Sequence, residues 1–337
     1  MNVDNTPDPV IDRDLPTPKT EALAAQAPRK RRWRERIPVV SQLRQSVGLQ
    51  RGMLVTGLVI TGVFVLVAIL APLIAPYSWA QQSVNGVKFG TQQPPSATNI
   101  LGTTVSGFDV FSRVIWGSQT ALLVILAAIA CSIFIGIALG LVSGYFGGWL
   151  DRTLVVIADA IYAFPSLLLA IVMSIVISHG QSNQWSGIMA TALSITVVFV
   201  PQYFRVIRAE VVRVRAEPFV ESAKVIGVPT GRILTRHVLR NSTRSLPVVI
   251  TLNASEALLT LAGLGFLGFG IEATSAAEWG YDLNRAIADV TSGIWWTSIF
   301  PGLAIVLVVL GITLVGESLN DLSDPRLRTR RRAGGAA

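Results

Sequence analysis

Long apolar runs alternate with polar segments along this chain of 337 residues. A helix needs about 20 apolar residues to cross a bilayer, at about 1.5 Å per residue. Six runs predict membrane-spanning helices: Met53–Ala75, Leu122–Val142, Leu154–Ile177, Ile188–Phe204, Leu246–Leu267 and Ile294–Val315. The third and fourth have the least defined ends, and Asp159 and Pro165 interrupt the third.

The fold class follows from the length of these runs. In lipid, only helices and closed barrels satisfy the backbone hydrogen bonds, and the runs are far too long for barrel strands. The sequence therefore predicts an all-α integral membrane protein with six spanning helices in a domain over 51–317. An outer loop is expected over 76–119 and a cytoplasmic loop over 205–245. A disordered basic tail over 1–50 and a second tail over 318–337 are expected at the ends.

The basic residues indicate the orientation. Of the 28 Lys and Arg residues, 25 lie in the first 51 residues, at Arg152, within 205–244 or after the last span. This bias predicts that both termini are cytoplasmic. Because this distribution of basic residues explains the net charge of +8, the charge does not indicate a nucleic-acid partner. The cluster Arg29–Arg36 predicts contact with anionic membrane lipids, at about 1 kcal/mol per basic residue.

The opposite loops are predicted to form an acidic outer face. The acids on that side are Asp109, Glu272, Glu278, Asp282 and Asp289.

Composition supports the membrane assignment, and the motifs offer no catalytic centre. Hydrophobic residues make up 51% of the chain and charged residues 14%, against about 25% charged in soluble domains. The stretch Gly263–Gly268 matches a dinucleotide-binding pattern, but it closes a spanning segment, so its glycines predict close packing or a bend. The chain contains no P-loop motif, and His179 and His237 lack metal-ligand spacing. The chain is therefore predicted to be no enzyme and to bind no metal or cofactor itself.

Three polar residues fall within the predicted spans: Asp159, Asn253 and Glu256. A charge at the centre of a bilayer is costly and usually faces protein or water. These residues either line a translocation path or, for Glu256, form a protonated or hydrogen-bonded carboxyl at a helix contact. The pattern leaves both interpretations open.

The loop over 205–245 contains a polar, basic stretch between two spans. Pro218 suits the first turn of a helix, Glu221 suits its positive end, and Gly227 can supply a left-handed cap. These residues predict a short helix over Pro218–Ile226, and a second helix over Gly231–Leu239. A helix this short is marginal in water, so it needs a docking surface, either on the chain's own membrane domain or on another protein.

The residues of this loop resemble the EAA loop of ABC importer permeases. The resemblance rests on Glu221, Ser222, Ala223, Gly227, Ile233, His237, Leu239 and Asn241. Ser222 replaces an Ala of the family pattern, and Arg240 replaces a Pro. Residues outside the loop agree, and they include Leu101–Thr103, Gly144–Trp149, Ala163–Ser166, Gly265–Gly268 and Phe300–Leu303. Over about residues 50–328, the chain is most similar to the C-type subunit of the dipeptide and oligopeptide permeases.

The resemblance implies a type I ABC importer permease in the bacterial cytoplasmic membrane. The short helix would be a coupling helix seated on a separate ATPase, with Phe219 and Val220 packed in its groove and Glu221 in polar contact. The full set implied to couple is Phe219, Val220, Glu221, Ser222, Ala223, Gly227, Ile233, His237 and Asn241. The implied partners are a homologous B-type permease subunit, two ATPase subunits or a fused pair, and an extracytoplasmic peptide-binding protein. The ATPases would bind ATP and Mg.

Two alternatives remain open. One is an importer of nickel or another small solute in the same family, and the other is an ATP-independent secondary transporter or channel.

Overall fold

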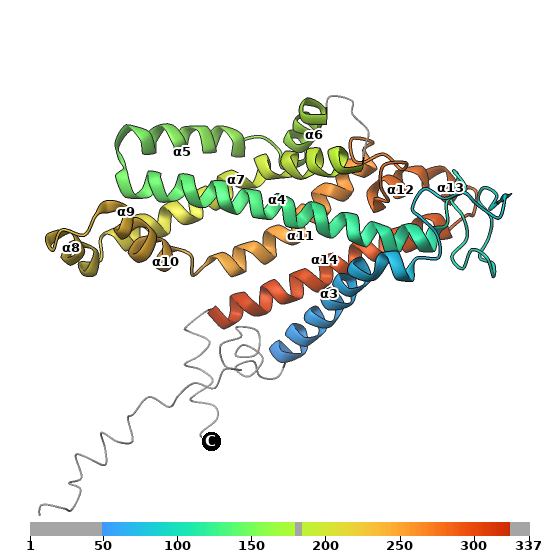
Figure 1. The fold of residues 1–337 in the computed structure, drawn as a ribbon, viewed down its shortest axis with the longest axis horizontal. Helices are drawn as coiled ribbons and strands as arrows, with labels where there is room; N and C mark the ends of the chain where they lie inside the picture. The colour runs from blue at the N-terminus through green and yellow to red at the C-terminus, as the bar shows by residue number, and fades with distance from the viewer. Residues whose placement is uncertain (1–48, 179–183, 324–337) are drawn as a thin grey trace, which may run out of the picture. The chain divides into compact units, whose positions relative to one another are not determined.

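The computed structural model describes residues 49–178 and 184–323, which all lie in one compact unit. Helices make up most of this unit (Figure 1). The predicted basic tail before residue 49, with its cluster Arg29–Arg36, and the end of the chain after Ser323 lie outside the described residues.

Five helices of the described unit are long and apolar enough to cross a membrane. They are α3 (Leu49–Ile74), α4 (Val110–Phe146), α7 (Gln184–Arg215), α11 (Leu246–Phe266) and α14 (Trp296–Ser323). Each contains one of the predicted spans almost entirely. The predicted boundaries need correction in three places, because α4 begins within the expected outer loop, α7 continues into the expected cytoplasmic loop, and α14 extends past residue 317.

The third predicted span is two helices rather than one. α5 (Gly148–Tyr162) and α6 (Ser166–Ser178) meet at an angle of 97°. Pro165 lies in the break between them, where it lacks an N–H and disfavours a helical conformation in the residue before it. Counted as one broken span, the pair brings the total to six.

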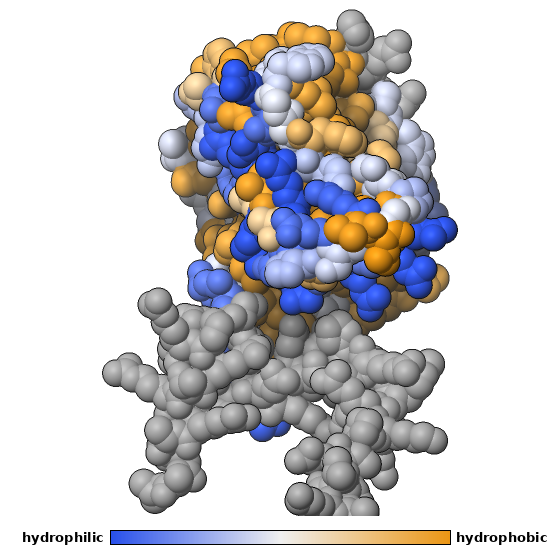
Figure 2. Space-filling model, turned by 90° about the vertical axis from the view of Figure 1, so that its left-hand side faces the viewer, coloured by the Kyte–Doolittle hydropathy of each residue, from blue (hydrophilic) through white to orange (hydrophobic). Residues whose placement is uncertain are grey.

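The short elements gather at two opposite ends of the described unit, called here the α8 end and the α12 end (Figure 1). The α8 end carries α8 (Pro218–Val225), α9 (Thr230–Arg232), the π-helix η2 (Ile233–Val238) and α10 (Leu239–Ser242). The α12 end carries the hairpin of β1 (Ser83–Val84) and β2 (Val87–Lys88), then α12 (Trp279–Arg285) and α13 (Ile287–Thr291). Hydrophilic residues spread over the α8 end, with a group of hydrophobic residues among them (Figure 2).

Glycines allow α4 and α7 to pack closely. A methyl group on Gly136 would come within 2.5 Å of the Tyr203 Cβ, and one on Gly144 within 2.9 Å of the Arg208 backbone oxygen. Gly140 lies between them on the same face and meets Ile207 in the same way. Small residues at a four-residue spacing let helix backbones approach in lipid, and these three glycines have that spacing.

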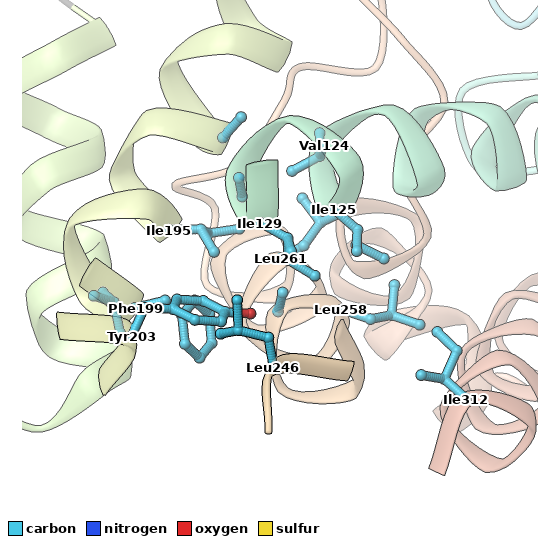
Figure 3. Packing of buried hydrophobic residues seen from close by; sticks show 14 of the residues in the cluster. Val124, Ile125, Ile129, Ile195, Phe199, Tyr203, Leu246, Leu258, Leu261 and Ile312 are labelled. Atoms are coloured by element: carbon cyan, nitrogen blue, oxygen red, sulfur yellow. The ribbon is translucent and has the colours of Figure 1, made fainter. Parts of the chain in front are cut away.

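The hydrophobic core lies between α4, α7, α11 and α14 (Figure 3). Its buried residues include Val124, Ile125, Ile129, Ile195, Phe199, Tyr203, Leu258, Leu261 and Ile312. Leu246, the first residue of α11, belongs to the same cluster. The core therefore holds α7 and α11 together, and these two helices lead into and out of the α8 end.

Candidate functional site

The helix α8 begins at the predicted residue and ends at Val225, one residue before the predicted Ile226. Pro218 is its first residue, and Gly227 has φ of +77°. The Gly227 N–H donates to the Lys224 oxygen, and the Val228 N–H donates to the Ala223 oxygen, each at 3.0 Å. These two bonds form a Schellman motif, which requires a left-handed residue at the position of Gly227.

One face of α8 packs against its own chain. Val220 is fully buried and Ala223 nearly so, in the same cluster as Val214, Ile233 and Val238. This corrects the expectation that Val220 packs in a groove on an ATPase. Val220 and Ala223 instead pack with Val214, Ile233 and Val238, which provide the docking surface that so short a helix needs.

The opposite face of α8 is exposed and partly apolar. Phe219 is 42% exposed, Val225 86% and Ile226 78%, and Glu221 and Ser222 are exposed beside them. The resemblance to the permease loop does not include Val225 among the coupling residues. The sequence feature that could have indicated this surface is the pair of apolar residues, Val225 and Ile226, directly before the capping glycine. Large apolar residues exposed together among polar ones are typical of a protein–protein contact.

Arginine and lysine side chains from α7 and α8 bind the ends of α4 and α5. Arg215 Nη1 donates to the carbonyl of Tyr145 at 2.8 Å, near the carboxyl end of α4, which satisfies a carbonyl without a helical partner. The Lys224 ammonium lies 5.6 Å from the centre of the Tyr145 ring. Arg208 Nη2 donates to Asp151 at 2.7 Å on the first turn of α5. A displacement of α8 would therefore act on α4 and α7 directly.

The predicted second helix of the loop is present in three parts, α9, η2 and α10. His237 and Asn241 are half-buried, and Asn241 Nδ2 donates to the His237 carbonyl at 2.7 Å. These contacts stabilise the turn that leads into α11. Neither residue shares the exposed face of α8.

A second candidate site is a cavity of about 240 Å³ beside α11, named here the Glu256 cavity. Its lining residues are Ile161, Tyr162, Phe164, Ser166, Leu169, Val198, Phe199, Gln202 and Glu256. They come from α5, α6, α7, α11 and the break between α5 and α6. The break between α5 and α6 thus leaves a partly polar space beside α7 and α11. The other faces of these two helices pack in the hydrophobic core.

The three polar residues predicted within the spans do not meet at one point. Glu256 is exposed and lines the cavity. Asp159 is exposed and pairs with Arg205 Nη2 at 2.7 Å, and this arginine stacks over Tyr162, 4.4 Å from the ring centre. Asn253 is only 1% exposed and does not line the cavity. The sequence pattern does not indicate Gln202, Tyr162 and Arg205, because they lie on helices distant from Glu256 in sequence.

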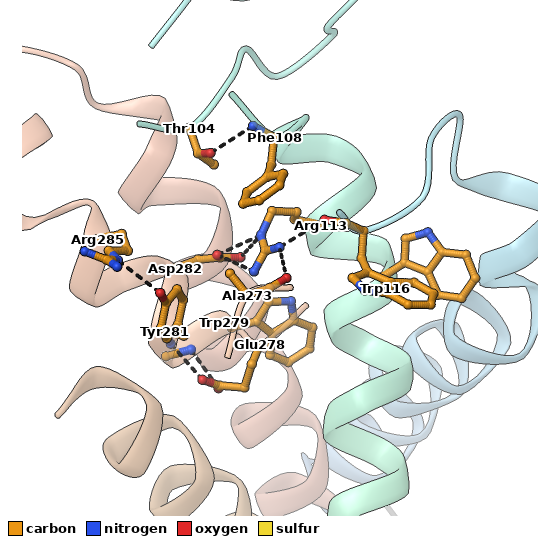
Figure 4. Close-up of polar contacts among 12 residues, drawn as sticks. Thr104, Phe108, Arg113, Trp116, Ala273, Glu278, Trp279, Tyr281, Asp282 and Arg285 are labelled. Carbon is orange, nitrogen blue, oxygen red and sulfur yellow. Dashed lines mark hydrogen bonds and ion pairs between the residues drawn. The ribbon is translucent and has the colours of Figure 1, made fainter. Parts of the chain in front are cut away.

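A buried ion pair organises the α12 end (Figure 4). Arg113 is 1% exposed, and its Nε donates to both Asp282 carboxylate oxygens at 2.7 and 2.8 Å. Its Nη1 donates to the carbonyls of Trp79 at 3.0 Å and Ala273 at 3.3 Å. One arginine therefore joins α4, the segment after α3 and the segment before α12.

The acids of this end are mostly internal, which corrects the prediction of an acidic outer face. Of the five acids predicted there, Asp109, Glu278, Asp282 and Asp289 are buried, and Glu272 is exposed. Glu278 caps α12 by accepting hydrogen bonds from the N–H groups of Gly280 and Tyr281. Burial raises the pKa of Glu278 to about 8, although these two bonds oppose the shift.

Comparison with known proteins identifies the class that this architecture defines. Residues 136–329 match the family described as binding-protein-dependent transport system inner membrane component. Residues 49–95 match the N-terminal transmembrane domain of oligopeptide transport permease C. The chain belongs to the family of binding-protein-dependent inner membrane permeases, and it is a multi-pass component of the bacterial inner membrane.

Individual relatives cover most of the chain. It is 36% identical to the dipeptide transport system permease protein DppC of Alkalihalophilus pseudofirmus, over 82% of this chain and 86% of that protein. It is 32% identical to the glutathione transport system permease protein GsiD of Pectobacterium atrosepticum, over 80% and 87%. A putative peptide transport system permease of Brucella suis is 33% identical, over 81% and 87%.

Proposed function

We propose that this chain is the permease subunit through which an ATP-driven importer moves di- and oligopeptides into a bacterium. The relatives named for dipeptide, glutathione and peptide transport support the substrate class. The observation that carries the coupling role is the division of α8 into a face buried in this chain and an exposed apolar face. Such a helix is anchored to the spans and still offers a contact surface to a partner.

In this proposal, the α8 end faces the cytoplasm and docks on a separate ATPase that binds ATP and Mg. Phe219, Glu221, Ser222, Val225 and Ile226 form the contact surface. Gly227 fixes the end of the helix, while His237 and Asn241 hold the turn into α11. ATP-driven movement of the ATPases then displaces α8, and Arg215, Lys224 and Arg208 carry that displacement to α4, α5 and α7.

The remaining partners complete the path. A homologous B-type permease subunit forms the other half of the pore, two ATPase subunits or a fused pair supply the work, and an extracytoplasmic binding protein delivers the peptide at the α12 end. The Glu256 cavity is the part of the path that this chain contributes. The tail before residue 49 would contact anionic lipid.

Reconstitution tests the proposal. The chain is placed in proteoliposomes with its candidate partner permease and ATPases, and ATP hydrolysis is measured with the binding protein loaded with a dipeptide, with nickel, or empty. Stimulation by the dipeptide-loaded protein is expected. Stimulation by nickel alone would favour the small-solute importer, and uptake by this chain without nucleotide or partners would contradict coupling altogether.

A further inference from the structure

The Glu256 cavity contains one carboxylate in an unusual position. Glu256 is the eleventh of the 21 residues of α11, so it lies at the middle of a membrane span. Its side chain is exposed, yet a charge that faces hydrocarbon at this depth is costly. The carboxylate therefore faces a polar partner or an aqueous space rather than lipid, and the cavity that it lines is such a space.

Arg205, which contacts a lining residue of the cavity, is already paired. Arg205 is bound to Asp159 at 2.7 Å and stacks over Tyr162, which is the wall of the cavity on that side. Within 49–178 and 184–323, no hydrogen bond or ion pair neutralises the Glu256 side chain. Glu256 is thus the one acidic residue of the cavity lining, and the lining contains no basic residue.

The other lining groups suit a small cation that carries an amide. Phe164 and Phe199 supply aromatic rings, whose faces attract cations. Gln202 and Ser166 supply an amide and a hydroxyl that can bond a peptide group. A carboxylate, aromatic rings and neutral polar groups together form the recognition set for a protonated amine next to a peptide bond.

We propose that the Glu256 cavity binds the protonated α-amino group of the peptide during its passage, with Glu256 as the residue that selects for positive charge. The inference rests on the proposed function, and it assigns the permease itself a part in substrate selection. A peptide whose amino group is replaced by a neutral group loses the contact with Glu256. Its carbonyl groups still reach Gln202 and Ser166.

The test compares Glu256→Gln with the unaltered chain in the full reconstituted complex. ATP-dependent uptake is measured for Ala-Ala and for lactoyl-alanine, in which a hydroxyl replaces the amino group. Because both complexes use the same binding protein, the ratio of wild-type to variant uptake cancels the selection that this protein makes. Glu317→Gln is the matched control, since Glu317 is an exposed acid on α14 that does not line the cavity.

We expect a ratio of about ten for Ala-Ala, which corresponds to about 1.4 kcal/mol, and a ratio near one for lactoyl-alanine. Glu256→Asp retains the charge and is expected to keep most of the uptake of Ala-Ala. A series of pH values gives a second measurement on Ala-Ala alone. The ratio should fall toward one as the pH of the entry side rises past about 8, where an α-amino group loses its proton.

Two results would overturn the inference while leaving the proposed function intact. One is an equal ratio for both substrates and at every pH, which is expected if Glu256 pairs with a basic residue of the second permease subunit. The other is unchanged uptake in Glu256→Gln. If the wild-type complex shows no ATP-dependent uptake of either substrate, that result contradicts the proposed function itself, and with it the inference about Glu256.

Discussion

Gly227 gives the sharpest test of how α8 is held. Its φ of +77° lies in the left-handed region, and a methyl group built on it meets no atom within 4 Å. The cost of Gly227→Ala is therefore confined to the backbone, at about 1 kcal/mol. The two hydrogen bonds that end the helix depend on this conformation. A cost of 1 kcal/mol is about a fivefold change in the population of the opened segment.

Amide hydrogen exchange of the purified chain in lipid nanodiscs would measure this population. We expect the amides of Gly227 and Val228 to exchange about fivefold faster in Gly227→Ala. Gly227→Asn should stay near the wild type, because asparagine adopts the left-handed region more easily. Gly231→Ala is the matched control: Gly231 is also exposed with open space around it, but it lies in the helix α9 without a positive φ.

Alanine at Gly231 should leave exchange unchanged or slow it, because alanine favours a helix more than glycine does. The two substitutions add the same methyl group to exposed positions in the same loop. Equal exchange in Gly227→Ala and Gly231→Ala would refute the argument that the left-handed cap holds α8.

Three further predictions follow from the buried and exposed sides of the sites. Val220→Asp should lower the thermal unfolding midpoint, because Val220 is buried. Phe219→Ala should leave the midpoint unchanged and weaken co-purification of the ATPase. Equal effects of the two substitutions on the midpoint would contradict the assignment of Val220 to the buried face and Phe219 to the exposed face. Arg113→Ala leaves Asp282 buried without its partner and should cost about 3–5 kcal/mol, seen as a lower midpoint that Arg113→Lys partly restores. Burial raises the pKa of Glu278 to about 8 in the folded chain. The contribution of this carboxyl to stability is therefore fully present below the ordinary pKa of a glutamate, and it is lost as the pH rises through about 8. The midpoint should therefore fall between about pH 4.5 and 8 in the wild type and level off above pH 8. It should fall less in Glu278→Gln, and an equal fall in both would contradict the assignment.

The sequence predicted more at the α8 end than at the α12 end. The cap at Gly227 and the start at Pro218 are local properties, because a left-handed glycine and a first-turn proline act within a few residues. The face on which Val220 lies is not local, because it depends on where η2 and the end of α7 pack. The residues of α8 were therefore found, and their division between core and surface was not.

The outer acids and the third span illustrate the same limit. A charge in a loop between spans predicts exposure, yet Asp282 is buried because Arg113, 169 residues earlier, lies opposite to it. Pro165 marked a weak point in the third span, but the 97° bend depends on what α5 and α6 pack against. Pair interactions between distant residues leave no periodic signal in the chain.

The sequence by itself determined the number and approximate place of the spans, the class of protein and the cap of α8. The thickness of the bilayer and the geometry of a helix end act on consecutive residues, so the order of residues suffices for them. Only the tertiary structure decided which acids are paired, which face of α8 is free, and that Gln202 and Tyr162 join Glu256 around one cavity. Those properties depend on side chains that come together only when α5, α7 and α11 have packed, and the free energy of burial and pairing arises only there.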